Sequence, residues 1–448
     1  MTGYRLDPSY RRPNRGSTIL AGSPLRIFRL STAGVGIAEL IEGNQGLPAG
    51  HQRLTDRLVD AGAIHPIATP VNAVSAESVT LVVPTWNRDV TITHRGPIIV
   101  VDDASTVPCS FPSGCTVIRH DINRGPGAAR MTGLAAVTTP YVAFIDADVS
   151  VTADWLQSLL GHFDDPRCAL VAPRVRSAEL QSNSLLDRYE VLRSPLDLGL
   201  QPARIAAGTA VSYVPAAAMV CRVDAIRQVD GFDSSMRFGE DVDLVWRLEQ
   251  LGWRCRYEPS SVVTHQPRPS WKAWAVQRVS YGSSAAPLAR RHPSSVAPAH
   301  VSGWSLLIWT MIASSHPLAA AVIAGANAIG LRRKLPDLST ETTLLVVNGH
   351  RFAGLQLANA IRRVWLPVAL VGCLFSRRAR LITATAFAAT LLDRRGTPPA
   401  GSIDPCSYLA IRVADDACYC AGVWTGAVTE RSIAALVPRV SGWPGRST

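Results

Sequence analysis

The apolar positions between residues 78 and 267 fall in short runs, each about the length of one strand. Residues 79–83, 97–101 and 141–145 are rich in β-branched side chains, and each run ends in polar residues. Strands that are continuously apolar are typical of the middle of a parallel sheet, with ligand-binding residues at their carboxyl ends. The pattern therefore predicts an α/β domain over residues 76–300, with its functional residues at one edge of the sheet.

The pattern is different over residues 1–75. Residues 18–30 predict one or two strands, and residues 31–42 predict a helix that Ser31 can cap. A second helix is expected over about residues 52–60. Strands and short helices in so few residues indicate a small winged-helix-like module. Its core is too small for much stability alone, so we expect it to dock on its neighbour.

Residues 301–448 form an apolar, arginine-rich and mainly helical region. Residues 292–331 contain no Asp, Glu, Lys or Arg, and residues 304–331 are long enough for one membrane span. A break at residues 314–317 leaves two alternatives open, a buried helical hairpin and two helices lying in the membrane interface. Two shorter apolar runs suit helices that rest on anionic lipid, which makes a membrane surface an expected partner. They are residues 365–375 and 381–392, flanked by Arg362, Arg363, Arg377, Arg378, Arg380, Arg394 and Arg395.

The charge balance narrows the classes of partner. The formal net charge is +11, and Lys272 and Lys334 are the only lysines among 45 basic residues. This balance suits nucleic acid, anionic lipid or phosphorylated ligands. The arginines are scattered through apolar sequence and no nucleic-acid motif occurs, so we expect no nucleic-acid partner.

Cysteine usage and the N-terminus bear on the compartment. The nine cysteines include no CxxC pair, and free thiols in a reducing cytosol are the simplest account of them. No secretory signal is visible at the N-terminus. We therefore expect the active site in the cytoplasm, with the chain associated with the cytoplasmic face of the cell membrane.

Two aspartates follow the apolar run at residues 141–145. Asp146 and Asp148 lie two positions apart, so both can turn toward one site as the chain leaves the sheet. Such a pair suits Mg²⁺ or Mn²⁺, which takes oxygen ligands and keeps positions for a diphosphate. His265 follows a later strand-like run and is a candidate to complete the metal shell or to contact a phosphate. Solvated loop aspartates and a structural histidine are the alternatives.

Polar residues after another run are candidates for binding a nucleotide donor. Asp102 and Asp103 can offer a carboxylate to the imide N–H of a uracil or to its ribose, although an Asx turn accounts equally well for one of them. A turn with Asn123 and Gly125 opens a helix, so its backbone can approach a diphosphate and Arg130 can face the phosphate or ribose. An ordinary loop-to-helix connection is the alternative for this turn.

An acidic pair opens a predicted helix further along the chain. Glu240 and Asp241 precede residues 242–248, whose apolar positions recur at helical spacing. Negative charge is favoured in the first turn of a helix, which is a sufficient structural reason for the pair. The functional alternative makes Asp241 a general base that deprotonates an acceptor hydroxyl.

These polar segments keep a fixed order along the predicted sheet domain. They are PTWNR at residues 84–88, VDDAS at 101–105, NRGPG at 123–127, DAD at 146–148 and GEDVDL at 239–244. In this order they resemble the family 2 glycosyltransferases. The resemblance implies a Rossmann-like GT-A fold, a UDP-sugar donor, a divalent metal (Mn²⁺ or Mg²⁺) and inversion at the anomeric carbon.

The resemblance also implies a role for each matched residue. It places Asp103 on the uracil, Asp146 and Asp148 at the metal and diphosphate, and Asp241 as the catalytic base. His265 joins Asp148 as a metal ligand. The remaining residues expected to bind the donor are Pro84, Asn87, Asp102, Asn123, Gly125 and Arg130.

The whole layout points to a narrower group. Processive synthases of the family carry QxxRW after the base, whereas this chain has QRVSYG at residues 277–282, which argues against a long-polymer synthase. Residues 18–31 and 62–66 are similar to PqqD-like peptide-binding modules. Together with the apolar tail, this layout resembles the mycofactocin-system glycosyltransferases of actinobacteria. It implies glucose as the sugar and a ribosomal-peptide-derived, mycofactocin-type redox cofactor or its precursor as the acceptor.

Three alternatives stay open at this point. A family 2 enzyme of similar layout can act on a cell-envelope lipid or polysaccharide. A nucleotidyltransferase on a similar sheet needs a basic glycine-rich signature near the first strand, which residues 84–88 do not provide. A peptide-binding protein with a vestigial transferase domain is predicted to bind peptide through residues 1–75 and no UDP elsewhere.

Overall fold

The computed structural model describes residues 3–68, 74–178, 184–293, 295–393 and 403–442. The chain divides into two compact units, Met1–Gln181 with Glu190–Pro267 and Ser182–Tyr189 with Arg268–Thr448. Residues 1–75, called the front module below, therefore belong to the same unit as the predicted sheet. The division from the C-terminal region falls near Pro267, earlier in the chain than residue 300.

The front module contains the predicted strands β2 (Thr18–Ala21) and β3 (Arg26–Arg29) and the predicted helices α1 (Thr32–Glu42) and α2 (Gln52–Asp60). It also contains three short elements that were not predicted, β1 (Tyr4–Leu6), the 3-10 helix η1 (Pro13–Arg15) and β4 (Ile64–Pro66). β2 pairs with β3 and β1 with β4, both antiparallel. The Ser31 hydroxyl accepts the N–H of Gly34 at 3.2 Å and caps α1, as expected. Buried Ile19, Phe28 and Leu58 belong to a core that is separate from that of the large sheet.

Nine strands of the same unit form one mixed sheet. They are β5 (Val79–Thr85), β6 (Ile98–Asp102), β7 (Thr116–Arg119), β8 (Tyr141–Ile145), β9 (Val149–Ser150), β10 (Cys168–Ser177), β11 (Ala203–Arg204), β12 (Ala218–Arg222) and β13 (Arg254–His265). The order is β11-β13-β10-β12-β8-β5-β6-β7, with β9 paired to β13. β8, β5, β6 and β7 run parallel, which confirms the prediction made from the three apolar runs. β12 is antiparallel to both of its neighbours.

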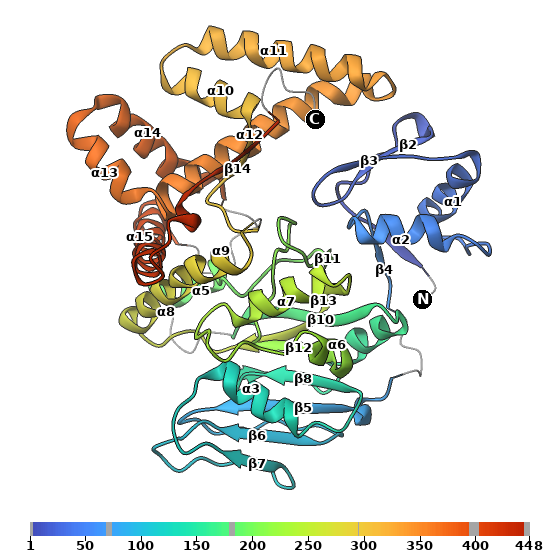
Figure 1. Cartoon of the computed structure of the whole chain (residues 1–448), viewed down its shortest axis with the longest axis vertical. Coiled ribbons are helices and arrows are strands. Elements are labelled where there is room, and N and C mark those ends of the chain that lie inside the picture. The colour runs from blue at the N-terminus through green and yellow to red at the C-terminus, as the bar shows by residue number, and fades with distance from the viewer. Residues whose placement is uncertain (1–2, 69–73, 179–183, 294, 394–402, 443–448) are drawn as a thin grey trace. The chain divides into compact units, whose positions relative to one another are not determined.

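Several helices outside the front module pack on this sheet. α3 (Pro126–Ala135) lies against β5 and β6, α6 (Val223–Gln228) against β12, and α7 (Glu240–Gln250) against β13 (Figure 1). Tyr141, Trp155 and Phe163 contribute large side chains to the core on the sheet. The remaining helical segments are the 3-10 helix η2 (Ala76–Ser78), α4 (Gln157–Leu160) and the 3-10 helix η3 (Gly161–Asp164).

The second unit is mainly helical. It contains the first residues of α5 (Leu185–Arg193), then α8 (Trp271–Ser283), α9 (Ala285–Arg291), β14 (His300–Ser302), α10 (Gly303–Ala313), α11 (Pro317–Lys334), η4 (Pro336–Leu338), α12 (Ser339–Arg363), α13 (Leu366–Phe375), α14 (Arg377–Ala388), η5 (Ala389–Asp393), α15 (Pro405–Thr429), η6 (Ala434–Leu436) and β15 (Arg439–Ser441). α8 and α15 pack without space between their backbones. A Cβ on Gly282 would lie 2.1 Å from the carbonyl oxygen of Tyr419, and one on Gly422 would lie 2.0 Å from that of Val279.

Residues 304–331 do not form one long helix. The chain breaks between α10 and α11, and Ser315 has a positive φ of 65° there. Over the described part of the chain, no single helix combines the length and the apolar composition of a membrane span. The pair Glu341–Arg363 and Leu366–Phe375 meets both criteria together, with a bend of 87° between its halves. Arg394 and Arg395, expected to flank the last apolar run, lie outside the described residues.

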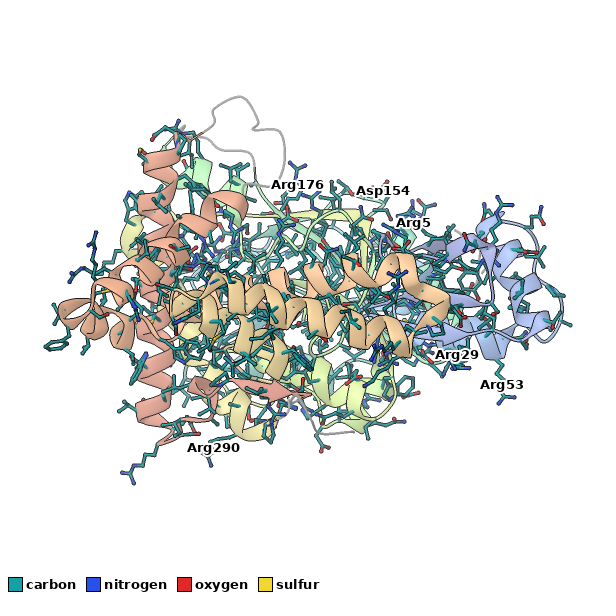
Figure 2. The ribbon with its side chains drawn as sticks, turned by 90° about the horizontal axis from the view of Figure 1, so that it is seen from above. Arg5, Arg29, Arg53, Asp154, Arg176 and Arg290 are labelled. Atoms are coloured by element: carbon teal, nitrogen blue, oxygen red, sulfur yellow. The ribbon has the colours of Figure 1, made fainter. Side chains whose placement is uncertain are left out.

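The excess positive charge is spread over the surface. Figure 2 labels exposed arginines on the front module (Arg29 and Arg53), on the sheet (Arg176) and on α9 (Arg290). This dispersion agrees with the scatter of arginines along the sequence.

Gly133 provides a test of how closely α3 must approach the sheet. A Cβ at this position would lie 2.3 Å from Val82 Cγ1 and 3.3 Å from Val101 Cγ2. We expect Gly133→Ala to lower the free energy of unfolding by roughly 1–3 kcal/mol through overpacking, measured as a lower urea midpoint.

Gly36 supplies the matched control for this substitution. It lies in a helix, α1, with open space around its Cβ position. Gly36→Ala should leave stability unchanged or raise it by up to about 1 kcal/mol. Equal effects of the two substitutions would show that the close approach of α3 does not limit stability.

Candidate active site

The parallel strands β5, β6 and β8 end side by side, so the polar residues that follow them share one edge of the sheet. Pro84 is buried near the end of β5, opposite Val101. Asp102 ends β6, and Asp146 follows β8 directly. This arrangement confirms the expectation that the polar segments meet at the carboxyl edge of the sheet.

Asp103 anchors the turn that opens α3. Its Oδ1 accepts the backbone N–H of Arg124 at 2.9 Å, and its Oδ2 accepts that of Gly125 at 2.8 Å. His120 Nδ1 lies 2.6 Å from Oδ1, and the Asn123 side-chain amide donates to the Asp103 carbonyl at 3.2 Å. Gly125 has a φ of 89°, where a side chain would be strained. The structure thus brings three predicted donor-binding residues together, with Asp103 holding the turn in place.

Asp102 and Asn87 shape the neighbouring loop. Asp102 Oδ1 accepts the N–H of Ser105 at 2.9 Å, and its Oδ2 pairs with Arg119. Burial raises the pKa of Asp102, but the hydrogen bonds from Ser105 and the Arg119 guanidinium outweigh it and lower the pKa below its ordinary value. The N–H of Asn87 donates to Ser105 Oγ at 2.7 Å, and its Oδ1 accepts the N–H of Thr106 at 2.6 Å. Asp102 therefore accepts a backbone N–H three residues on, one position further than in the Asx turn that was considered for one of the two aspartates.

Arg130 lies on the predicted helix α3 and is buried between two carboxylates. Its side chain is only 3% exposed; Nη2 donates to Asp146 Oδ1 at 2.6 Å and Nη1 to Glu240 Oε1 at 2.8 Å. The guanidinium also lies over the ring of Phe232, 5.4 Å from its centroid. Burial lowers the pKa of Arg130, but the two carboxylates raise it above its ordinary value. The guanidinium is thus paired with two carboxylates of the protein, and its expected contact with the donor phosphate or ribose stays a prediction.

Arg130 and Asp241 belong to one closed ring of hydrogen bonds and chain links. Asp241 Oδ2 accepts the backbone N–H of Ala216 at 3.1 Å. The carbonyl of the next residue, Ala217, accepts the backbone N–H of Asp146 at 3.0 Å. The ring passes through Arg130, Glu240, Asp241, Ala216, Ala217 and Asp146. It fixes the first turn of α7 against the end of β8.

The two acids at the start of α7 hold their protons unusually tightly. Burial raises the pKa of Glu240 to about 7; the neighbouring Asp241 carboxylate adds to the rise and Arg130 opposes it. Burial also raises the pKa of Asp241 above its ordinary value, against the N–H groups of Ala216 and Val242 and the charge of Arg130. Asp241 is half-buried, whereas Glu240 is buried. Asp241 is thus the acid of the pair that solvent can reach, with a pKa closer to neutrality than an exposed aspartate has.

Asp148 and His265 form a second pair at the same edge. β9 pairs with the end of β13, so that His265 lies opposite Val149. His265 Nε2 is 3.4 Å from Asp148 Oδ2, and Arg88 Nη1 is 4.0 Å from the same oxygen. Neighbouring ligands of one small cation, each about 2.1 Å from it, lie about 3 Å apart, so the separation and the donor types suit a divalent metal. Within the described ranges, no three His, Cys, Asp or Glu side chains gather into a metal site.

Two residues at this edge, His120 and Glu240, have contacts that their sequence context did not predict. His120 joins Asp103 to Thr132, with Nε2 2.9 Å from the threonine oxygen. It follows β7, so the rule that polar residues follow apolar strands would have found it had this short, half-exposed strand been recognised. Glu240 was assigned only to the helix dipole, and no local signal connects it to Arg130, 110 positions earlier.

Comparisons with known proteins bear on the family of the chain and its enzyme class. The family model described as "Glycosyl transferase family 2" matches residues 97–227. Two curated relatives, both named "Pre-mycofactocin glycosyltransferase" and from two strains of Mycobacterium tuberculosis, are 40% identical over 97% of this chain and 97% of their own length. A solved mannosyltransferase of Pyrobaculum calidifontis, in complex with GDP-Man and Mn²⁺, is 16% identical, covers 84% of this chain and 93% of its own, and has a TM-score of 0.43.

The raised pKa of Glu240 predicts a pH-dependent stability. In the unfolded chain a glutamate has a pKa of about 4.3, whereas the folded protein holds this proton up to about 7. As the pH rises from 5 to 8, the unfolded state loses the proton first, so stability falls. Glu240→Gln removes this titration. Between pH 5 and pH 8 we therefore expect the free energy of unfolding of the variant to fall by about 2 kcal/mol less than that of the wild type.

Urea denaturation at both pH values measures this difference. Glu77 is exposed, so Glu77→Gln serves as the control and should show the pH dependence of the wild type. The same pH dependence in all three proteins would mean that Glu240 does not titrate in this range.

Proposed function

The chain belongs to the pre-mycofactocin glycosyltransferases of glycosyltransferase family 2, and from this premise we propose that it transfers glucose from a UDP-sugar to a mycofactocin-type redox cofactor or its precursor. The acceptor is thus derived from a ribosomal peptide, and the transfer inverts the anomeric carbon. The observation that carries the proposal is the ring that holds Asp241 at the carboxyl edge of the sheet, where Asp148 and His265 form a second pair.

Asp241 is the general base of the proposed reaction. Its half-buried carboxylate accepts the Ala216 amide through Oδ2 and the Val242 amide through Oδ1 at 2.8 Å, so the side chain is held in place while an acceptor hydroxyl approaches it. Burial raises the pKa of Asp241, which makes the carboxylate a stronger proton acceptor than an exposed aspartate. Removal of the hydroxyl proton prepares the oxygen for in-line attack on the anomeric carbon. Attack from the face opposite the leaving diphosphate inverts that carbon.

Asp148 and His265 are the proposed metal ligands. Their atoms converge at 3.4 Å, and oxygen atoms of the donor diphosphate and water would complete the coordination. A bound Mn²⁺ or Mg²⁺ would neutralise the charge that develops on the departing nucleoside diphosphate. Asp146, one side of which is bound to Arg130, borders this position.

The uracil and ribose are proposed to bind where Asn87, Asp102, Asp103, Asn123 and Gly125 meet. The hydrogen bonds from Asp103 fix the Arg124–Gly125 backbone, and the positive φ of Gly125 keeps that backbone uncovered by a side chain. A diphosphate can therefore approach the amino end of α3 closely.

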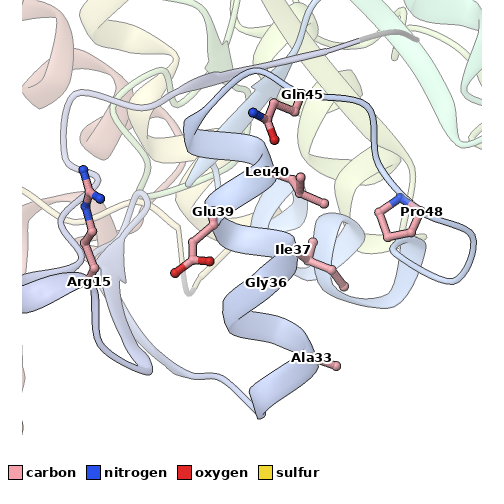
Figure 3. Close-up of a pocket in the computed structure, with 8 residues that line it drawn as sticks. All are labelled: Arg15, Ala33, Gly36, Ile37, Glu39, Leu40, Gln45 and Pro48. Carbon is pink, nitrogen blue, oxygen red and sulfur yellow. The ribbon is translucent and has the colours of Figure 1, made fainter.

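The front module is the proposed PqqD-like, winged-helix-like element that recognises the acceptor. An open pocket of about 620 Å³ lies along the outer side of α1, and Figure 3 shows its lining. Ile37 and Leu40 supply apolar surface, and Arg15 and Glu39 supply both signs of charge. This mixture suits a peptide-derived molecule with apolar and ionised groups. The other lining residues are Ala33, Gly36, Gln45 and Pro48.

We also propose that the second unit rests on the cytoplasmic face of the cell membrane. No residue of α13 is buried, and Leu374 and Phe375 at its end are 75% and 84% exposed. Exposed Arg377 and Arg378 follow immediately in α14. Apolar side chains beside arginines suit a surface of anionic lipid. All nine cysteines are free, which supports a reducing compartment.

Asp241→Asn tests the proposed base. We expect transfer of hexose from UDP-glucose with Mn²⁺ to fall roughly 100- to 10,000-fold, because the amide cannot accept the proton. Binding of UDP should be retained. Mass spectrometry of the acceptor measures the transfer, and calorimetric titration measures UDP binding.

Asp154→Asn is the matched control, since this aspartate is exposed on the surface (Figure 2). It should transfer hexose at the wild-type rate. Full activity of Asp241→Asn would exclude Asp241 as the base. A wild-type protein that neither binds UDP nor transfers sugar would support the alternative of a vestigial transferase domain, and transfer only to envelope lipid or polysaccharide would support the other acceptor class.

Vesicle binding tests the proposed membrane surface. We expect the full chain to co-sediment with vesicles of phosphatidylglycerol and phosphatidylcholine, and less with phosphatidylcholine alone. Arg377→Gln with Arg378→Gln should lower the partition coefficient on anionic vesicles roughly ten-fold or more, since each arginine contributes about 1 kcal/mol.

Val428→Ser serves as the control for apolar exposure, because Val428 is 73% exposed at the end of α15. It should bind like the wild type, whereas Leu374→Ser with Phe375→Ser should bind less. Equal binding of every variant to both vesicle types would contradict a membrane surface on α13 and α14.

A further inference from the structure

Three carboxylates surround one arginine where the front module meets the sheet. Arg254 Nε donates to Asp60 Oδ1 at 2.6 Å, and its Nη2 donates to Asp56 Oδ1 at 2.9 Å; both aspartates lie on α2. Its Nη1 donates to Asp165 Oδ2 at 2.8 Å. The Arg254 side chain is only 11% exposed, so this cluster differs from an ordinary surface ion pair, which contributes little.

A second set of contacts joins the front module to the segment that leaves β11. Arg204 donates through Nη1 to the carbonyl of Asp60 and through Nη2 to Glu249 Oε1 at 2.7 Å. The backbone N–H of Ala210 donates to the hydroxyl of Ser23 at 2.7 Å. The front module therefore holds this segment at residues 204 and 210. We call residues 204–217 the bridging segment.

The other end of the bridging segment belongs to the active site. Trp246 of α7 donates its indole N–H to the carbonyl of Ser212 at 2.8 Å. The N–H of Ala216 donates to Asp241 Oδ2, and the carbonyl of Ala217 accepts the N–H of Asp146. Only a few residues separate the contact with the front module at Ala210 from the contact with the base.

We propose that the front module acts as a positioning element for catalysis, in which Ser23 and Arg204 hold the bridging segment so that the amide of Ala216 stays on Asp241. The proposal rests on the proposed role of Asp241 as the base. It gives the front module a function that does not depend on acceptor binding. Ser23 and Arg204 are positioning residues, because they act on Asp241 through the backbone and do not touch it.

Loss of the Ala216 hydrogen bond would change the proton affinity of Asp241, which a purely structural role of the front module would not do. An N–H that donates to a carboxylate favours its charged form. The charged side chains linked to Asp241 are Arg130 from α3, Asp146 after β8 and Glu240 on α7, and their side-chain contacts with one another do not involve the front module. Loosening the bridging segment should therefore raise the pH at which the base loses its proton.

The double substitution Ser23→Ala with Arg204→Gln tests the proposal in the full chain. We expect the hydrogen exchange of the Ala216 amide to become at least ten-fold faster, because the segment opens locally. With UDP-glucose, Mn²⁺ and acceptor, kcat should fall roughly ten-fold, the acidic limb of the pH profile should move to higher pH, and the KM for UDP-glucose should stay within about two-fold. Ser23→Thr keeps the hydroxyl and should behave like the wild type.

Arg290→Gln is the matched control for loss of an arginine–glutamate pair. It breaks the exposed contact of Arg290 Nη1 with Glu430 Oε2 at 2.6 Å in the second unit (Figure 2) and should change none of these readouts. Unchanged exchange at Ala216 together with an unchanged pH limb in the double variant would overturn the proposal. Failure of the proposed function would show differently, as a wild type without transfer or an Asp241→Asn variant that retains it.

Discussion

The buried guanidinium of Arg130 connects the two sides of the candidate site. Its helix, α3, begins at the turn that Asp103 holds, and its side chain reaches Asp146 after β8 and Glu240 at the start of α7. Taking these charges out of water costs several kcal/mol per ion, which is offset only when each is paired with good geometry. The contacts are 2.6 and 2.8 Å long, so the ends of β8 and α7 have little freedom to move apart. The position of Asp241 thus depends on a residue that it does not touch.

This arrangement leaves the edge of the sheet rich in negative charge. Arg130 is committed to Asp146 and Glu240, and Asp241 and Asp148 add further carboxylates on the same side. A diphosphate that approaches such an edge is repelled unless a cation lies between them. Asp148 and His265, the proposed metal ligands, would hold such a cation at this edge. The carboxylates gathered at this edge therefore explain both why Arg130 is paired and why the proposed reaction would need a metal.

Local patterns were enough to predict the three apolar strands at residues 79–83, 97–101 and 141–145, whereas contacts between residues far apart in the sequence were not predictable. The run at residues 141–145 and the helix at residues 52–60 depend on neighbouring side chains, and both are found as expected. The gathering of Asp102, Asp103 and Asp146 at one edge follows from parallel strands. The partner of Arg130 lies 110 positions away, and the partner of Asp241 is a backbone amide, which has no sequence signal. These contacts become visible only when the sheet has assembled.

The arginines of the C-terminal region are a second case in which distant partners could not be predicted from the sequence. Sequence alone groups Arg362 with Arg377 and Arg378 as flanks of apolar runs that face lipid. In the structure Arg362 is buried and donates to Asp416 Oδ2 at 2.7 Å, whereas Arg377 and Arg378 are exposed. An arginine paired inside a helical bundle is not available to a phosphate headgroup, because its desolvation is already offset by the aspartate. The proposed lipid surface is therefore limited to α13 and the start of α14, and Arg362 is excluded from it.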